Sequence, residues 1–110
     1  MDFRTENVGT DIAVIRGDGR LNMVSAPHLR EQVTRAINAG RNRIVVDLAA
    51  TSFIDSSGLG ALVGSLKAAR QADGDLRIAA PNDQVRMVLS LSNVDRVLRS
   101  YTDPGDAFSD

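Results

Sequence analysis

With 110 residues, 13 basic and 14 acidic side chains and a net charge of -1, the chain has the size of one globular domain and no excess charge to attract nucleic acid or an anionic membrane. It contains no cysteine and one histidine, which excludes disulfides and zinc clusters. Oxygen-only cation sites stay open, but no carboxylate cluster suggests one, and we expect no metal and no other cofactor. A polar N-terminus, and no apolar run near the ~20 residues that cross a bilayer, predict a soluble, cytoplasmic protein without direct membrane insertion.

The first half of the chain is expected to form strands on either side of one helix. Residues 11–16 (D-I-A-V-I-R) are a short apolar run that ends at G-D-G, a pattern typical of a turn, and a further strand is expected at residues 3–8. Ser25 is predicted to cap a helix that ends at Gly40, a residue suited to a left-handed helix stop. Residues 43–48 (R-I-V-V-D-L) are almost continuously apolar, as in a central strand covered on both faces.

The second half is predicted to continue this alternation. Apolar residues at helical spacing indicate a second helix, in which Ser65 is expected to face solvent. These apolar residues are Leu59, Leu62, Val63, Leu66 and Ala69. Residues 76–80 are expected to form a strand, and Asn82 or Asp83 is expected to cap a third helix. A last short strand is predicted at residues 97–101, before a polar tail that begins at D-P-G-D.

Strands that alternate with helices of this length predict an α/β domain. No internal repeat, low-complexity segment or linker divides the chain. We therefore expect residues 1–110 to form a single domain.

The stretch F-I-D-S-S-G-L-G, residues 53–60, joins an apolar run to the second helix and places two hydroxyls at the joint. One interpretation is structural: a serine there would cap the helix, and Gly58 and Gly60 would allow close backbone packing. A nucleophilic serine is a second interpretation. The G-x-S-x-G pattern lacks its first glycine, however, and His28 lies upstream at the start of the first helix. We therefore expect no catalytic residue and no enzymatic activity.

A phosphate-binding loop is a third interpretation of the same stretch. The run G-L-G-A-L-V-G, residues 58–64, has a glycine spacing faintly like that of a dinucleotide loop. The apolar spacing places these glycines inside the second helix, and neither a G-K-[ST] motif nor an acidic residue at the end of the next strand follows. Nucleotide binding is kept as a secondary hypothesis.

A modification site is the fourth interpretation. A hydroxyl at a helix N-terminus precedes the packed turns, and a phosphate there, with a charge of about -1.5 to -2, meets the positive end of the helix dipole. The fold itself would tolerate this group, whereas a partner packed over it would bury a dianion at a cost of several kcal/mol. Asp55 adds a negative neighbour. Such a site could switch an interaction without a large change of shape.

The chain resembles STAS domains, specifically bacterial anti-sigma factor antagonists. The resemblance rests on V-V-D-L-A-A-T-S-F-I-D-S-S-G-L-G-A-L, residues 45–62. The flanking runs G-R-L-N-M-V-S-A-P-H-L-R and L-R-I-A-A-P-N-D-Q-V come in the order the family shows. The likeness covers about residues 12–106 and implies a single STAS domain, in which a mixed β-sheet carries helices mainly on one face.

The resemblance also implies a phosphorylation switch at Ser56. In such proteins the first serine of the pair is phosphorylated by the partner, an anti-sigma factor that is a serine kinase. The unphosphorylated form binds the anti-sigma factor and frees the sigma factor, and a serine phosphatase resets the phosphorylated form. Contacts with the partner are implied for Asn22, Met23, Ser25, Asp55, Ser57, Gly58 and Leu59.

The chain departs from the family pattern in three places. Asn22 stands where many members carry an acidic residue, and the segment before Val94 reads L-S-N-V in place of a T-G-L-like turn. The C-terminal tail is short, so the final helix is expected to have only a turn or two. The departures before Val94 and in the tail leave the phosphate acceptor unchanged and concern the packing of the last third of the chain, whereas the one at Asn22 concerns the contact with the partner.

Alternative functions share the same motif. A STAS subunit of a sensory scaffold or of a membrane transporter would differ in its partners, and a small nucleotide-binding protein would belong to a different class. Two other polar side chains are given structural roles. Asp47 is expected to bond loop amides at the end of its strand, and Ser90 is expected to face solvent.

Overall fold

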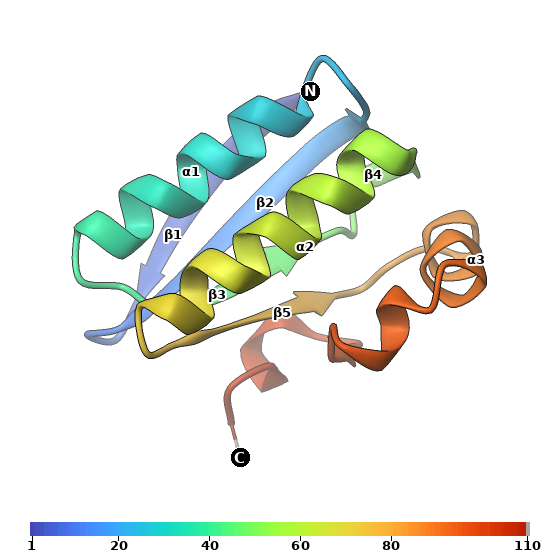
Figure 1. The fold of residues 1–110 in the computed structure, drawn as a ribbon. Helices are drawn as coiled ribbons and strands as arrows, with labels where there is room; N and C mark the ends of the chain where they lie inside the picture. Colours follow the sequence, from blue (N-terminus) through green and yellow to red (C-terminus); the bar gives the residue numbers. More distant parts are fainter. Residues whose placement is uncertain (110) are drawn as a thin grey trace.

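The computed structural model describes residues 1–109, which form a mixed β-sheet and three α-helices (Figure 1). The strands are β1 (Asp2–Val8), β2 (Ile12–Leu21), β3 (Arg43–Asp47), β4 (Thr51–Ile54), β5 (Asp75–Ala79) and β6 (Ser100–Tyr101). The helices are α1 (Ala26–Asn38), α2 (Ser56–Gln71) and α3 (Asp83–Leu91), with 3₁₀ turns η1 (Val94–Arg96) and η2 (Pro104–Asp106). The predicted fold class, an α/β domain with a mixed sheet, is confirmed.

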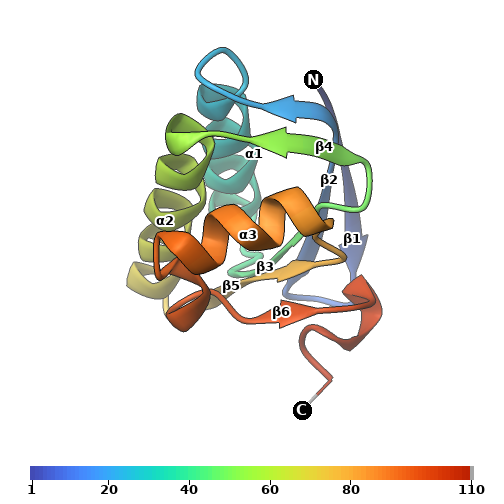
Figure 2. The same cartoon turned by 90° about the vertical axis from the view of Figure 1, so that its right-hand side faces the viewer.

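The sheet has the strand order β1-β2-β3-β5-β6, and β4 pairs with the second half of β2. Only β1 runs antiparallel to its neighbour among these pairs; the other paired strands are parallel. Helices α1 and α2 lie side by side on one face of the sheet (Figure 2). Because both follow strands that point the same way, they begin at the same end of the molecule.

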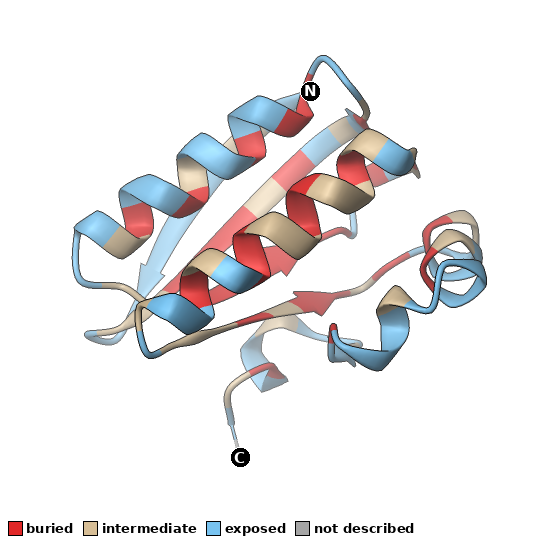
Figure 3. Ribbon diagram, viewed as in Figure 1, coloured by how far each residue is buried: buried red, intermediate tan, exposed pale blue. Residues whose placement is uncertain are grey.

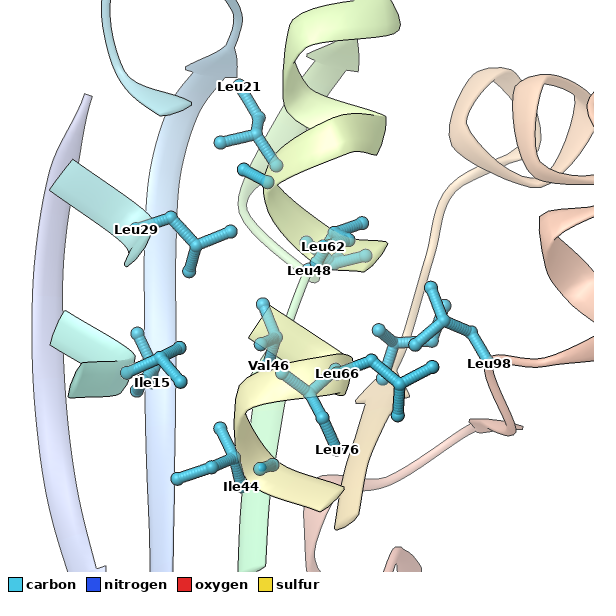
Figure 4. Packing of buried hydrophobic residues seen from close by; sticks show 14 of the residues in the cluster. Ile15, Leu21, Leu29, Ile44, Val46, Leu48, Leu62, Leu66, Leu76 and Leu98 are labelled. Carbon is cyan, nitrogen blue, oxygen red and sulfur yellow. The ribbon is translucent and has the colours of Figure 1, made fainter. Parts of the chain in front are cut away.

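The main core lies between the helices and the sheet (Figure 3). Its buried side chains come from alternate positions of the strands and from one stripe of each helix, as in Ile44 and Val46 of β3 and Leu62 and Leu66 of α2 (Figure 4). Val45 points to the other face of the sheet and is also buried, so β3 is covered on both faces as predicted.

Strand β2 is longer than predicted, because the G-D-G segment continues the strand instead of turning. Gly17 and Asp18 pair with Phe3 and Asp2 of β1. Gly19 has a φ of 119°, and the register shifts between Gly19 and Arg20, where β2 begins to pair with β4. The glycines thus bend a long strand at an irregularity, a role that Gly often has within sheets.

Strand β4 was not predicted. Its four residues, Thr51–Ile54, are buried at both ends and more exposed in the middle, and they lie in parallel register with the end of β2. The hydroxyl of Thr51 is buried and donates to the carbonyl of Gly17 at 2.8 Å. This pairing places Asp55, which precedes α2, next to Leu21, which precedes the β2–α1 loop.

The C-terminal tail was predicted to be polar, and this is wrong for its last part. Ala107 is fully buried, and Phe108 packs with Val14 and Val45 on the sheet face that carries no helix. Arg77 donates to the carbonyl of Ala107, and its guanidinium lies 4.4 Å from the centre of the Phe108 ring. The tail therefore covers the second face of the sheet near β3 and β5, as Figure 2 shows.

Candidate functional site

Helix α2 begins at Ser56, and the residue that caps it is Asp55. The Asp55 backbone is extended, and its carboxylate accepts a hydrogen bond from the Gly58 amide at 3.0 Å. A serine cap is therefore excluded for α2. Ser56 is exposed, its hydroxyl has no hydrogen-bond partner among residues 1–109, and Ser57 beside it is half-buried. We call residues 55–58 the serine corner.

The serine corner is fixed to the end of β2 by close packing. The Asp55 amide donates to the Leu21 carbonyl at 3.2 Å. Gly58 is buried against the same carbonyl, and a Cβ placed on Gly58 would lie 2.5 Å from the Leu21 oxygen and 2.8 Å from a side-chain carbon of Ile54. The predicted close packing is confirmed at Gly58. At Gly60 the nearest atom would be 3.7 Å away, so that glycine is not required for space.

The loop between β2 and α1 is held by its own polar side chains. The Asn22 carboxamide oxygen accepts from the amides of Val24 and Ser25 at 3.0 and 3.2 Å. The Ser25 hydroxyl is buried, donates to the Arg20 carbonyl at 2.7 Å and accepts from the Asn22 amide at 2.9 Å. Ser25 occupies the predicted cap position of α1, but its side chain bonds the loop and does not cap the helix. Its hydroxyl is thus unavailable for direct contact with a partner.

Two apolar side chains of this loop are exposed. Met23 and Val24 are 73% and 75% exposed, and they follow directly on Asn22. Since Leu21 and Ile54 are paired across β2 and β4, this loop and the serine corner extend from adjacent strand ends. The structure therefore brings together the two segments that the sequence analysis assigned to partner contacts. Val24 lies within the loop of residues 21–25 to which the resemblance assigns partner contact, although it is not among the residues singled out there.

Other chemistry at the serine corner finds little support in the geometry. His28 lies exposed in the first turn of α1, and no hydrogen bond joins it to Ser56 in the described part of the chain. Gly60 and Gly64 lie inside α2, as predicted, and form no loop that could cradle a phosphate. Within residues 1–109 no group of three or more His, Cys, Asp or Glu side chains is placed to hold a metal ion, and no helix has the length and hydropathy to cross a membrane.

A family model described as the STAS domain matches residues 5–107. The chain belongs to the STAS-domain family. Among its relatives, the anti-sigma-B factor antagonist of Staphylococcus aureus is 32% identical over 80 residues, which cover 73% of this chain and 74% of the relative. A Thermotoga maritima protein that is provisionally named an anti-sigma factor antagonist has a crystal structure with a TM-score of 0.87 and 31% identity, over 96% of this chain and 90% of that chain.

The structure of this STAS domain also matches the anti-sigma factor antagonist SpoIIAA. The unphosphorylated form of SpoIIAA gives a TM-score of 0.81 and 25% identity over 96% of this chain and 92% of that chain. The phosphorylated form, from Bacillus, gives a TM-score of 0.74 at 24% identity, which compares the fold alone. The resemblance drawn from residues 45–62 is thus confirmed at the level of the family.

Three polar side chains of the STAS domain lie outside the serine corner and bear on the predictions made from the sequence. Asp47 accepts from the Ala49 amide at 3.0 Å and pairs with Arg16 at 3.3 Å, which confirms its role at the end of a strand. Ser90 is exposed as predicted. Ser65 was predicted to face solvent, and this is wrong: it is 2% exposed, because α2 packs against both the sheet and α1.

Ser65 and Ser25 make a matched pair for a stability measurement, since both hydroxyls are buried. The Ser65 hydroxyl has no hydrogen-bond partner among the described residues. We expect Ser65→Ala to leave the free energy of unfolding unchanged or to raise it by up to ~1 kcal/mol. Ser25→Ala removes two hydrogen bonds and should lower it by about 1–3 kcal/mol. Urea unfolding followed by circular dichroism measures both free energies. An equal loss of stability in the two variants would contradict the difference in hydrogen bonding between Ser25 and Ser65.

Proposed function

We propose that this STAS domain is an anti-sigma factor antagonist whose binding to an anti-sigma factor serine kinase is switched off by phosphorylation of Ser56. The observation that carries the proposal is the division of roles at the serine corner. Asp55 caps α2, which leaves the Ser56 hydroxyl exposed and without a partner at the first helical position. The names of its relatives and of SpoIIAA support the part of the proposal that makes the domain an anti-sigma factor antagonist.

The proposed reaction makes the domain a substrate and not an enzyme. The Ser56 oxygen attacks the γ-phosphorus of ATP held by the kinase, the bond to the β-phosphate oxygen breaks, and ADP leaves. The hydroxyl proton passes to a base of the kinase. A serine phosphatase reverses the modification when water attacks the phosphorus and inorganic phosphate is released.

The proposed docking surface consists of the serine corner together with the exposed part of the β2–α1 loop. Met23 and Val24 offer apolar contact area, and Leu59 lies half-buried one turn into α2. Asn22 shapes this surface through its bonds to the loop amides. A dianion at Ser56 would lie beside these apolar side chains, so a partner that covers them must bury it or withdraw.

The acceptor is tested by incubating the domain with its cognate anti-sigma factor kinase and ATP, followed by mass spectrometry of peptides. We expect one phosphate, on Ser56. Ser56→Ala should abolish the modification. Ser57→Ala should retain it, because Ser57 is half-buried and stands at the second helical position after the cap. Phosphate that persists in Ser56→Ala, or that is lost only in Ser57→Ala, would overturn the assignment of the acceptor.

A further inference from the structure

The exposed guanidinium of Arg30 lies against α2 one to two turns from Ser56. It extends from α1 so that a Cβ on Gly64 would lie 3.4 Å from its central carbon, and a Cβ on Gly60 would lie 3.7 Å from one terminal nitrogen. Neither glycine has a side chain, so the guanidinium rests on a bare strip of helix. We call Gly60 and Gly64 the glycine track.

The glycine track leads to Ser56. Ser56, Gly60 and Gly64 are four residues apart, so they lie on one face of α2 in successive turns, each about 6 Å further along the axis. Because Cβ atoms lean toward the N-terminus of a helix, the surface that Arg30 contacts at Gly60 is the part that faces Ser56. Helices α1 and α2 begin at the same end of the sheet, which places the start of α1 beside the serine corner (Figure 1).

Arg30 also lacks a partner for its charge. No carboxylate or carbonyl accepts from its side chain among residues 1–109. Two other arginines on these helices are engaged: Arg35 of α1 pairs with Glu31 at 2.8 Å, and Arg70 of α2 pairs with Asp75 at 3.2 Å. Lys67 is exposed on α2, but it lies 11 residues after Ser56, about 16 Å along the helix axis.

We propose that Arg30 is the counter-cation of phosphorylated Ser56. Its guanidinium shifts along the glycine track by rotation of its side chain and forms charge-assisted hydrogen bonds with the phosphate oxygens. Arg30 is thus a positioning residue, which holds the phosphate against the α1–α2 surface. The inference depends on the proposed function, because it concerns the form that phosphorylation at Ser56 creates.

Three other side chains that can carry a charge lie at this end of the molecule. Asp55 is a carboxylate next to Ser56, and it already accepts from the Gly58 amide. Arg20 lies with its guanidinium carbon 4.4 Å from the centre of the Phe53 ring. His28 lies exposed in the first turn of α1, near the same end of the molecule, and its replacement serves as a control.

The test uses the full chain with phosphoserine incorporated at position 56 during translation, so that no kinase is needed. The second pKa of the phosphate is read by ³¹P NMR. We expect it to be higher in Arg30→Gln than with Arg30 present, by about 0.5 at low salt, because a nearby cation favours the dianion and salt screens this effect. Arg30→Lys should keep part of the effect. Each titration is repeated with His28→Gln.

Two controls separate a local pairing from a general effect of charge. Arg35→Gln removes the same charge from the same helix and should leave the phosphate pKa unchanged, since Arg35 pairs with Glu31. Phosphoserine at the exposed position 90 of α3 should not respond to Arg30→Gln. An equal pKa with and without Arg30, or an equal response to Arg35→Gln, would overturn the role of Arg30. Either result would leave Ser56 as the acceptor, which only the kinase experiment tests.

Discussion

We expect Gly58→Ala to lower the free energy of unfolding by about 2–4 kcal/mol, because the added methyl has no space at the serine corner. The methyl carbon would lie 2.5 Å from the carbonyl oxygen of Leu21 and 2.9 Å from a carbon of its side chain. This carbonyl also accepts from the Asp55 amide, so the strain would pull apart the junction between β2 and the start of α2. Urea unfolding measured by circular dichroism gives the change.

Gly60→Ala is the matched control on the same helix. Its methyl would lie 3.7 Å from the nearest atom, a terminal nitrogen of Arg30, which is an ordinary contact. Since Ala favours a helix over Gly by about 1 kcal/mol, we expect this variant to be as stable as the wild type or more stable by up to that amount. If Gly58→Ala were no less stable than Gly60→Ala, the close approach of α2 to β2 would be wrong.

The helices were predictable from local chemistry. Each has apolar residues at helical spacing, and residues that local rules favour stand at the start of α3 and after the end of α1. Asn82 accepts from the Val85 amide at 2.9 Å, as a cap of α3 should, and Gly40 after α1 has a φ of 85°. The apolar run of β3 was equally clear, because burial on both faces removes any alternation from the sequence.

The parts that escaped prediction depend on contacts distant in the sequence. The G-D-G segment, residues 17–19, reads as a turn, yet residues 17–21 form a strand because β1 and β4 supply partners for them. The four residues of β4 are too few for a periodic pattern to emerge. The burial of Ser65 depends on how closely α1 approaches α2, and the spacing of apolar residues within one helix does not predict this distance.

The serine corner was located from the sequence, but the residue that caps α2 was not. D-S-S permits a cap at any of three positions, and only the backbone shows that Asp55 takes it. Once Asp55 is the cap, Ser56 is the exposed hydroxyl and Ser57 turns partly inward. Arg30 could not have been assigned, since its position follows from the packing of one helix on the glycines of another.

We expect phosphorylation of Ser56 to weaken the association with the anti-sigma factor kinase about 100-fold, which corresponds to a loss of ~2.7 kcal/mol. The reason is the composition of the proposed docking surface. Met23 and Val24 are more than two-thirds exposed, and a partner that buries them also excludes water from the serine corner. A phosphate there loses hydration, the carboxylate of Asp55 beside it repels the dianion, and the single charge of Arg30 offsets only part of this cost.

Surface plasmon resonance or calorimetry with the cognate kinase and a non-hydrolysable ATP analogue measures the loss. Ser56→Ala should bind like the wild type, because a methyl group suits an apolar surface, and Ser56→Asp should fall between the alanine and phosphoserine forms, since it adds a single negative charge. Ser90→Asp places the same charge on the exposed surface of α3 and should leave the affinity unchanged. Equal affinities of the phosphorylated and unphosphorylated domains would show that Ser56 does not gate the interface. A loss in Ser90→Asp as large as in Ser56→Asp would assign the effect to net charge and not to the serine corner.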